Sequence, residues 1–539
     1  MKRRGDAGRR APEPRAGYQS SRVRAGNLQV AGPRSFIYLL VALFLVRSFI
    51  YASFIPPWQG PDEPLHYDYA RYLQLNKKLP VLGKTGLSKK TRLSLISFYF
   101  DEYANGRNPY AEKKTLNTKE IGTSKQNAEP IQERQNQIVQ HPPLYYFISA
   151  LILSLLQKSS LLTSIWILRM FSALFGLGVV ILTYLTVNLL YEKNKLPAVG
   201  AAAFVALNPM STHVTTIISN DSLINLLFAA FIYLLVKSIK KGFTEKRALA
   251  TGVVVGLGLL TKFFFFLALP VLVMAFWLFR KELTLDYKKP AFVFLPPLVL
   301  AGAYYFRNIS LYGTLQPSFR FSVQGINKNW SSVKFLLEAF RTFFISFWSN
   351  FGWQKPTFFK SFNLILFMVC LLALVGLGKY LFYLFRKKDF LKLKILGLLG
   401  IASLLLTLTI TFYAYKELKI SGLLQGTQGR YLFSFIGIFG LLLFLGLREL
   451  VPFKDGRLAL TVFIGGLIVL DISAIFYYIL PYFYQAGSSV FSTALQASQR
   501  AAADWFRLGP MYLASILAYL ALVIAIIFTT VWSFRGEKI

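Results

Sequence analysis

Two adjacent carboxylates, Asp62 and Glu63, are the residues in the sequence best suited to chemistry. They lie between Pro61 and Pro64 in the stretch IPPWQGPDEPLHYDYARYL, directly after an apolar run, residues 36–54. That run is long enough to cross a bilayer at a rise of 1.5 Å per residue. Because proline stops helices and stiffens the backbone, the stretch predicts a rigid turn where a membrane span ends. There a carboxylate would either take a proton from a substrate or merely cap the helix that follows.

The composition is that of a membrane protein. Hydrophobic residues make up 55% of the 539-residue chain and aromatic residues 16%, whereas only 24 residues are acidic. Long apolar runs alternate with short polar segments, which predicts an all-α, polytopic bundle of transmembrane helices. The formal charge of +36 comes from Lys and Arg between these runs, a pattern typical of cytoplasmic loops and of contact with anionic lipid. We therefore expect membrane lipid, and no nucleic acid, among the partners.

Residues for metal, redox and nucleotide chemistry are scarce. The chain has one cysteine, Cys370, and three histidines, so it cannot form an intrachain disulfide or a zinc or iron–sulfur site built from cysteines. The sequence also has no strand-GxGxxG-helix unit, P-loop or HExxH pattern. We expect no metal site and no cofactor, and we leave open whether a divalent metal ion is needed.

The basic residues predict which side of the membrane each loop occupies. Residues 1–34 carry nine Lys or Arg, which predicts a disordered cytoplasmic tail before an uncleaved first span. If residues 144–156 stay at the surface, all the short basic loops fall on the cytoplasmic side, as the positive-inside rule favours. We therefore expect a multi-pass protein of the cell inner (plasma) membrane with both termini cytoplasmic. Its twelve spans lie near residues 36–54, 165–190, 197–214, 222–238, 249–261, 263–279, 291–306, 361–385, 394–413, 430–447, 459–479 and 509–532.

The same topology gives the outer face a large first loop, residues 56–142. Its polar sequence predicts a mobile middle and two interfacial helices, at about 64–76 and 88–104. Residues 334–350 are apolar but interrupted by charged residues, and we expect them to lie at the outer surface as well.

Several charged residues also fall on this outer face. Asp221 opens the span at 222, where a carboxylate often caps a helix. Lys262 lies between two apolar stretches, where it would either snorkel to the surface or hold a lipid phosphate. Arg307 and Arg430 lie at span ends, where they would be interface anchors if considered singly. Two carboxylate positions and three cations on one face together predict a binding site for an anionic group.

Asp471 lies mid-span in the sequence LIVLDISAI. An acid inside the membrane either pairs with another helix or lines a functional cavity. Both roles stay open at this point.

Seven phrases of the sequence resemble those of a known superfamily in their order. They are PDEPLHYDYARYL, QHPPLYYF, ISNDSL, LLTKFF, YFRNISLYG, FWSNFGWQ and QGRYLF. The chain resembles the GT-C superfamily of integral-membrane glycosyltransferases from about residue 36 to about residue 450. It is most similar to a poorly characterised bacterial branch related to protein O-mannosyltransferases and aminoarabinose transferases.

The resemblance implies a reaction. GT-C enzymes transfer a sugar from a polyprenyl-phosphate carrier to an acceptor on the non-cytoplasmic face, with inversion at the anomeric carbon. The acceptor here would be a cell-envelope glycan, a lipid or a protein, and the sugar a hexose or a pentose. The chain then divides into a tail (1–34), a GT-C-like catalytic module (35–450) and C-terminal transmembrane helices (451–539).

The resemblance also implies roles for individual residues. The catalytic base falls on Asp62, with Glu63 beside it, and the second outer loop contributes Asp221. The first outer loop has no D-x-D motif, which argues against a metal-dependent mechanism of the oligosaccharyltransferase kind. The remaining expected substrate-binding residues, none of them a metal ligand, are His66, His141, Lys262, Arg307 and Arg430.

Two other functions fit parts of the sequence. A lipid or solute transporter would use Asp471 and the outer carboxylates as a path for protons or substrate. A polymerase or ligase of surface polysaccharide would share the lipid carrier but take a lipid-linked oligosaccharide as donor.

Overall fold

The computed structural model describes residues 33–100, 135–284, 286, 288–318, 330–353, 355–450, 456–485, 489–504, 506 and 508–533. Nearly all of the predicted N-terminal tail, and most of the middle of the first outer loop, lie outside these residues. Within them every regular element is a helix, and the only β-type pairing is an isolated bridge between Gly86 and Gln135. The predicted all-α fold class is therefore confirmed.

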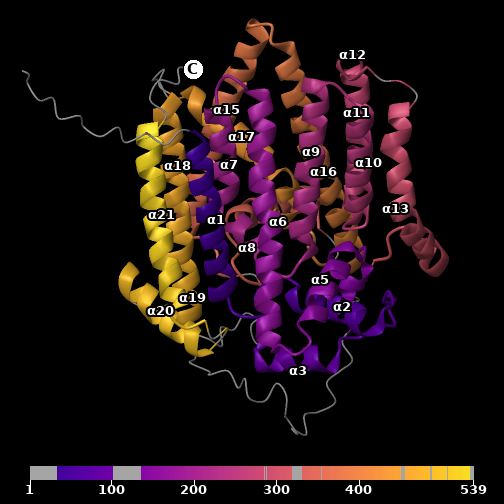
Figure 1. Ribbon diagram of the computed structural model, residues 1–539, viewed down its shortest axis with the longest axis vertical. Coiled ribbons are helices and arrows are strands. Elements are labelled where there is room, and N and C mark those ends of the chain that lie inside the picture. The colour runs from indigo at the N-terminus through magenta and orange to yellow at the C-terminus, as the bar shows by residue number, and fades with distance from the viewer. Residues whose placement is uncertain are drawn as a thin grey trace, which may run out of the picture.

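Nine helical segments in the described residues are long and apolar enough to cross a membrane. Three shorter apolar segments run beside them (Figure 1), namely α7 (Leu196–Leu207), α10 (Glu245–Leu259) and η3 (Phe263–Leu267) with α11 (Ala268–Leu278). The nine long segments match nine of the twelve predicted spans, and the other three, near residues 197–214, 249–261 and 263–279, fall on these shorter segments. The nine long segments are α1 (Pro33–Phe54), α6 (Leu161–Leu190), α9 (Asn220–Lys241), α13 (Lys288–Tyr312), α15 (Lys360–Arg386), α16 (Phe390–Ser421), η4 (Gly429–Phe435) with α17 (Ile436–Leu450), α18 (Gly456–Ser473) with η5 (Ala474–Ile479) and α19 (Leu480–Tyr484), and α21 (Met511–Ser533).

Short helices gather at one end of the bundle, which we call the carboxylate end. Figure 1 shows α2 (Glu63–Asn76), α3 (Lys89–Ser97) and α5 (Leu144–Leu155) there, whereas α12 (Arg280–Leu283) lies at the opposite, basic end. α2 and α3 correspond to the two predicted interfacial helices. α5 has 12 residues and is about 18 Å long, too short for a hydrocarbon core of about 30 Å. α7 has the same length, so length alone does not distinguish these two short apolar helices.

Helix α14 (Ser332–Trp348) forms in the predicted surface stretch and packs against η4 and α8 (Pro209–Thr215). It buries Phe335, Ala339 and Phe343 on one face. As described below, this helix positions part of the site.

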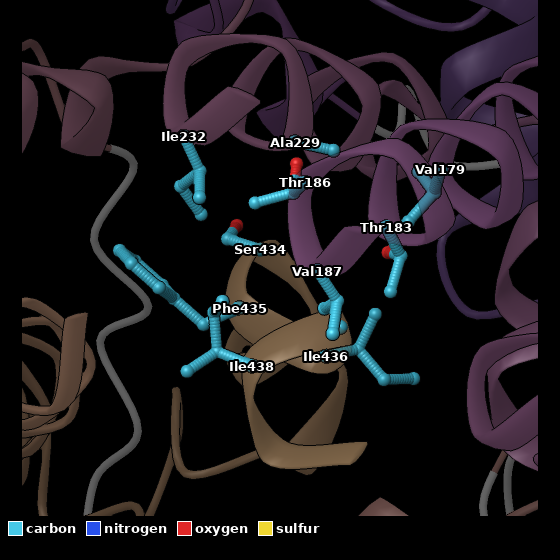
Figure 2. A pocket seen from close by; sticks show the side chains of 11 residues that line it. Val179, Thr183, Thr186, Val187, Ala229, Ile232, Ser434, Phe435, Ile436 and Ile438 are labelled. Carbon is cyan, nitrogen blue, oxygen red and sulfur yellow. The ribbon is translucent and has the colours of Figure 1, made fainter. Parts of the chain in front are cut away.

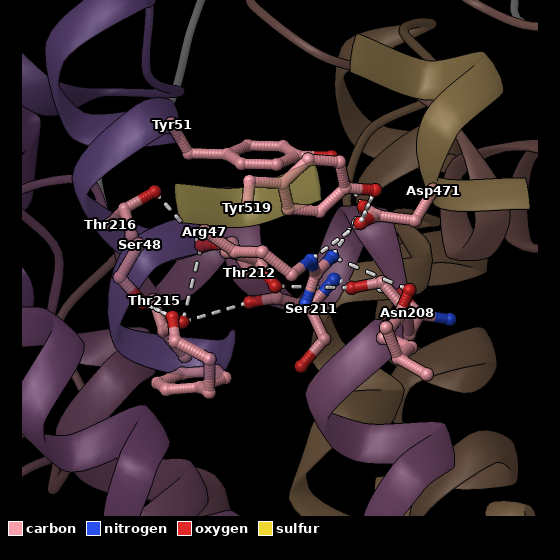
Figure 3. A network of polar contacts seen from close by, with 12 residues as sticks. Arg47, Ser48, Tyr51, Asn208, Ser211, Thr212, Thr215, Thr216, Asp471 and Tyr519 are labelled. Carbon is pink, nitrogen blue, oxygen red and sulfur yellow. Dashed lines mark hydrogen bonds and ion pairs between the residues drawn. The ribbon is translucent and has the colours of Figure 1, made fainter. Parts of the chain in front are cut away.

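A buried network ties the C-terminal helices to α1 (Figure 3). Arg47 donates from Nε to Asp471 Oδ2 at 2.7 Å and from Nη2 to Asp471 Oδ1 at 2.6 Å. Tyr519 donates to Asp471 Oδ2 at 2.8 Å, and both members of the ion pair are fully buried. Asp471 is therefore a cross-helix partner of Arg47, which answers the question that its mid-span position raised.

Helices α15 and α17 cross closely because glycines face each other. A Cβ atom on Gly376 would overlap the carbonyl oxygen of Gly446, and one on Gly446 would overlap the carbonyl of Ala373. Such small-residue crossings let helix backbones approach each other in membranes.

This crossing predicts that Gly376→Ala destabilises the protein by about 1–3 kcal/mol, the usual cost of overpacking a tight contact. Gly378→Ala on the same helix is the matched control, because a Cβ there meets no atom within 4 Å. Thermal unfolding in detergent should show a lower Tm for Gly376→Ala alone. Equal Tm values for the two variants would contradict the close crossing.

Candidate functional site

The turn that carries the two carboxylates is held by one arginine from α6. Arg169 donates to Glu63 through Nε (2.7 Å) and Nη2 (2.6 Å). Its Nη1 also donates to the carbonyls of Ala52 (3.0 Å) and Ile55 (2.6 Å), and its Nη2 to that of Pro56 (2.9 Å). Arg169 therefore fastens the end of α1, the turn and the start of α2 to one point.

Glu63 is part of this clamp. Its side chain is fully buried, and it accepts bonds from Arg169, from Ile218 N at 3.2 Å and from Gly60 N at 3.4 Å. A Cβ on Gly60 would collide with the side chain of Ile217, which explains the glycine before the acidic pair. Both oxygens of Glu63 therefore already have partners within the protein, and its side chain helps to fix the turn that carries Asp62.

Asp62 points elsewhere. Its backbone is left-handed (φ 58°, ψ 10°), and its side chain makes no capping bond to α2. Instead its Oδ2 accepts from Arg430 Nη2 at 3.2 Å, and 19% of its side chain stays exposed. Asp62 thus occupies the N-cap position of α2, but its carboxylate makes no capping hydrogen bond there. The left-handed backbone is uncommon outside glycine and adds strain that the surrounding contacts must sustain.

Three more charged residues complete a buried cluster with Asp62. Lys262 pairs with Asp221 Oδ1, and Arg430 Nε lies 3.6 Å from Asp221 Oδ2. Asp221, Lys262 and Arg430 are between 3% and 7% exposed. Ser219, not Asp221, caps α9, since its side chain accepts from Asp221 N. The carboxylate of Asp221 therefore serves the cluster.

Arg430 is positioned by the close approach of η4 to α14. A Cβ on Gly429 would overlap Phe347 N and Phe343 O, and Gly429 N donates to Ser346 Oγ at 2.8 Å. In the described part of the chain, Nε and Nη1 of Arg430 have no hydrogen-bond partner. A buried guanidinium with two unused donors is suited to a second anion, because buried donors are costly when unpaired.

Aromatic rings border the two cations. Both cations lie over the ring of Tyr431, whose centroid is 5.0 Å from Lys262 Nζ and 5.2 Å from Arg430 Cζ. Phe264 lies 5.2 Å from Lys262 Nζ. Such rings stabilise cations in a poorly solvated site.

His66 and His141 form an aromatic wall beside the cluster. Their rings are parallel within 3° with centroids 6.4 Å apart, and His66 Nδ1 lies 2.8 Å from the hydroxyl of Tyr146. Tyr69 stacks on Tyr146 at 3.9 Å. The two histidines that the sequence analysis selected from separate phrases are thus neighbours. The described residues contain no group of three or more His, Cys, Asp or Glu that could hold a metal ion.

Both imidazoles are held neutral. Burial, and next the proximity of His141, keep the pKa of His66 well below its usual range. Burial, and next the charge of Lys262, lower the pKa of His141 to about 3. Near neutral pH they offer a donor and an acceptor rather than a positive charge.

Arg307 makes no ion pair with the cluster in the described part of the chain. Its Nη2 donates to the carbonyl of Pro80 at 2.9 Å, between α2 and α3. Arg169 and Tyr431, by contrast, belong to the site but were missed in the sequence. Arg169 lies inside an apolar run, WILRMFSALF, and a charge at such a position is itself a sign of a specific partner.

A pocket lies next to the cluster on its basic-end side (Figure 2). It is lined by Val179, Thr183 and Val187 of α6, by Ala229 and Ile232 of α9, and by residues 434–438. Ser434 lines it and faces Asn225 Oδ1 at 3.3 Å. Asn225 follows Asp221, and Ser434 follows Arg430, by four residues each. The pocket therefore continues the site toward the middle of the bundle with mostly apolar walls.

Fold and site together define a multi-pass helical membrane protein with a buried cluster of two carboxylates and two cations. Residues 43–439 match the family described as predicted membrane protein DUF2142, so the chain belongs to this family. No curated protein matches the sequence.

The chain is also similar to solved membrane-protein structures. ArnT from Cupriavidus metallidurans bound to undecaprenyl phosphate is 14% identical with a TM-score of 0.44, over 93% of this chain and 78% of that chain. The apo state of that protein gives a TM-score of 0.46. The apo oligosaccharyltransferase of Archaeoglobus fulgidus is 13% identical with a TM-score of 0.41, and this chain spans 56% of its length. At such TM-scores a similarity assigns no function, which has to come from the site itself.

The lowered pKa of His141 predicts how stability depends on pH. The unfolded chain takes up a proton at this histidine below about pH 6.5, whereas the folded protein does so only near pH 3. The free energy of unfolding therefore falls as the pH decreases between these values. His141→Gln should flatten the fall of Tm in detergent between pH 6.5 and 4.5. An unchanged slope would show that His141 is protonated in the folded state.

Proposed function

We propose that this protein is an inverting glycosyltransferase that takes its sugar, a hexose or a pentose, from a polyprenyl-phosphate carrier. The acceptor is an extracytoplasmic glycan, lipid or protein of the cell envelope. The observation that carries this proposal is the buried cluster, in which a partly exposed carboxylate adjoins two cations and Arg430 keeps two donors unused.

The cations are suited to the phosphate of the carrier. Lys262, just before η3, and Arg430, in η4, converge on Asp221 from different segments of the chain. A phosphate oxygen within reach of Arg430 Nε and Nη1 would give these donors partners. Charge-assisted bonds in a poorly solvated site are stronger than their counterparts in water. Asp221 then holds the two cations in place when no phosphate is bound.

Asp62 is suited to the role of base. It is the most exposed member of the cluster, so an acceptor hydroxyl can approach its carboxylate from solution. Its single described partner is Arg430, through Oδ2. Taking the hydroxyl proton as the sugar leaves the phosphate makes the acceptor oxygen a better nucleophile.

The position of the site suits a lipid donor. Basic residues concentrate at the opposite end of the bundle, in segments such as 237–247 and 386–394. By the positive-inside rule we expect the carboxylate end to face away from the cytoplasm and both termini to lie inside. The carrier brings the activated sugar through the membrane, so no nucleotide site is needed.

The surroundings of Asp471 argue against the transporter alternative. Asp471 is fully buried and held by Arg47, Tyr519 and, at 3.4 Å, Tyr51. An acid with these partners is poorly placed to exchange protons with either side of the membrane. The glycosyltransferase proposal predicts release of polyprenyl phosphate in detergent without any gradient, when purified protein is incubated with polyprenyl-phosphate sugars and an acceptor. Activity that requires a proton gradient would favour the transporter.

Asp62→Asn tests the base. Asparagine tolerates the left-handed backbone of this position but cannot take the proton, so we expect kcat to fall by about 100-fold or more. Membrane insertion and Tm should stay close to those of the parent protein. Asp286→Asn, at an exposed acid of the basic end, is the control. Normal turnover by Asp62→Asn would remove Asp62 from this role.

Lys262→Ala and Arg430→Ala test the phosphate subsite. Each loses a charge-assisted bond worth about 1.5–3 kcal/mol, so the KM for the lipid donor should rise at least about 10-fold. Because either change leaves a buried carboxylate without its partner, the double variant Lys262→Ala/Asp221→Ala separates folding from binding. Arg341→Ala, at an exposed cation of α14, serves as control. An unchanged donor KM in both single variants would refute the subsite.

A further inference from the structure

His213, in the short helix α8, is a buried residue whose two ring nitrogens make no hydrogen bond to the described residues. It is fully buried, and neither Nδ1 nor Nε2 has a hydrogen-bond partner among the described residues. A buried donor or acceptor left unpaired costs about 1–3 kcal/mol. An imidazole with both nitrogens unpaired therefore destabilises the folded protein. A Phe side chain would fill the same space without this penalty.

The threonine hydroxyls of α8 do not share this defect. The hydroxyls of Thr212, Thr215 and Thr216 each donate to a backbone carbonyl of the same segment, and Figure 3 shows these side chains close to Arg47. Asn208 caps the helix by accepting from Ser211 N at 2.8 Å. Of this segment's buried side chains, Asn208 leaves one amide nitrogen, Nδ2, without a partner among the described residues, whereas His213 leaves both of its nitrogens.

His213 adjoins the site. Helix α8 packs against η4, which carries Arg430, and against α9, which carries Asp221. The charges of Arg169 and Arg430 both act on its imidazole, so it lies near the clamp of the turn as well as near the phosphate subsite. The ring of Phe351, just after α14, packs edge-on against it at 6.3 Å.

A neutral imidazole presents one N–H donor and one acceptor nitrogen. Hydroxyl groups of a sugar both donate and accept, so a sugar ring can satisfy both nitrogens at once. In the proposed donor the sugar is bonded directly to the phosphate, and a residue within electrostatic reach of Arg430 is therefore near that sugar.

We infer that His213 binds hydroxyl groups of the donor's sugar ring and so takes part in selecting the sugar. This inference rests on the proposed function, since it assumes that the carrier phosphate is bound by Arg430. It assigns to His213 a binding role, with no proton transferred in the reaction.

The test compares Tm shifts in detergent for the parent protein and His213→Phe. The probes are decaprenyl phosphate and its glucosyl, mannosyl and arabinosyl esters. Phe keeps the ring and removes the unpaired nitrogens, so the ligand-free variant should melt at least about 1 °C higher than the parent protein. Decaprenyl phosphate should stabilise both proteins equally. At least one sugar ester should stabilise the parent protein further than decaprenyl phosphate does, and His213→Phe should lose this increment.

Two further variants complete the experiment. His213→Gln keeps a donor and an acceptor and should recover part of the sugar increment. Thr212→Val, on the same helix, removes a hydroxyl that is bonded within α8 and should keep the increment in full. A sugar increment retained in His213→Phe, an increment absent from the parent protein, or a lower Tm of ligand-free His213→Phe would each overturn the inference. If decaprenyl phosphate and all its esters failed to shift the parent protein, the proposed function itself would fail.

Discussion

The bond between Arg169 and Glu63 is the interaction on which the site depends. Both side chains are fully buried, and the guanidinium also holds three carbonyls of the turn. Removing one partner of such a pair typically costs about 3–5 kcal/mol, because the other charge is left buried and unpaired. This cost makes the turn rigid. The strained backbone of Asp62 can then persist, since the clamp prevents the turn from relaxing toward a helical start.

The positive and negative charges of the cluster around Asp62 are equal in number. Two carboxylates and two cations lie in a site from which most water is excluded, so no member is left without an opposite charge. At an effective dielectric constant of about 20, two charges 4 Å apart interact by about 4 kcal/mol. Each cation is therefore costly to remove alone. The arrangement nevertheless leaves two donors of Arg430 unpaired, and stability alone does not require this.

The long apolar segments and much of the candidate site could be predicted from the sequence, and the reasons are physical. Hydropathy and basic loops depend on local composition, so they predicted the nine long apolar segments and the shared end of Asp62, Asp221, Lys262 and Arg430. Pairing depends on helix packing between distant segments, which local patterns do not contain. The partnership of Glu63 with Arg169, 106 residues away, was therefore missed, and Glu63 was grouped with the catalytic residues only because it is adjacent to Asp62. Arg307 was included for its position at a span end, and packing turns it toward Pro80 instead.

The charge balance has a consequence for the proposed reaction. The donor is a phosphate diester with one negative charge, and cleavage of its bond to the sugar leaves a phosphate that carries a second. In the same step Asp62 takes up the acceptor's proton and loses its own negative charge. The sum of charges inside the site is therefore unchanged, while negative charge moves from Asp62 to the phosphate. Arg430 contacts Asp62 at the start and would be released toward the phosphate as that charge moves. A guanidinium placed between base and leaving group, with free donors on one side, is suited to stabilising both ends of this transfer.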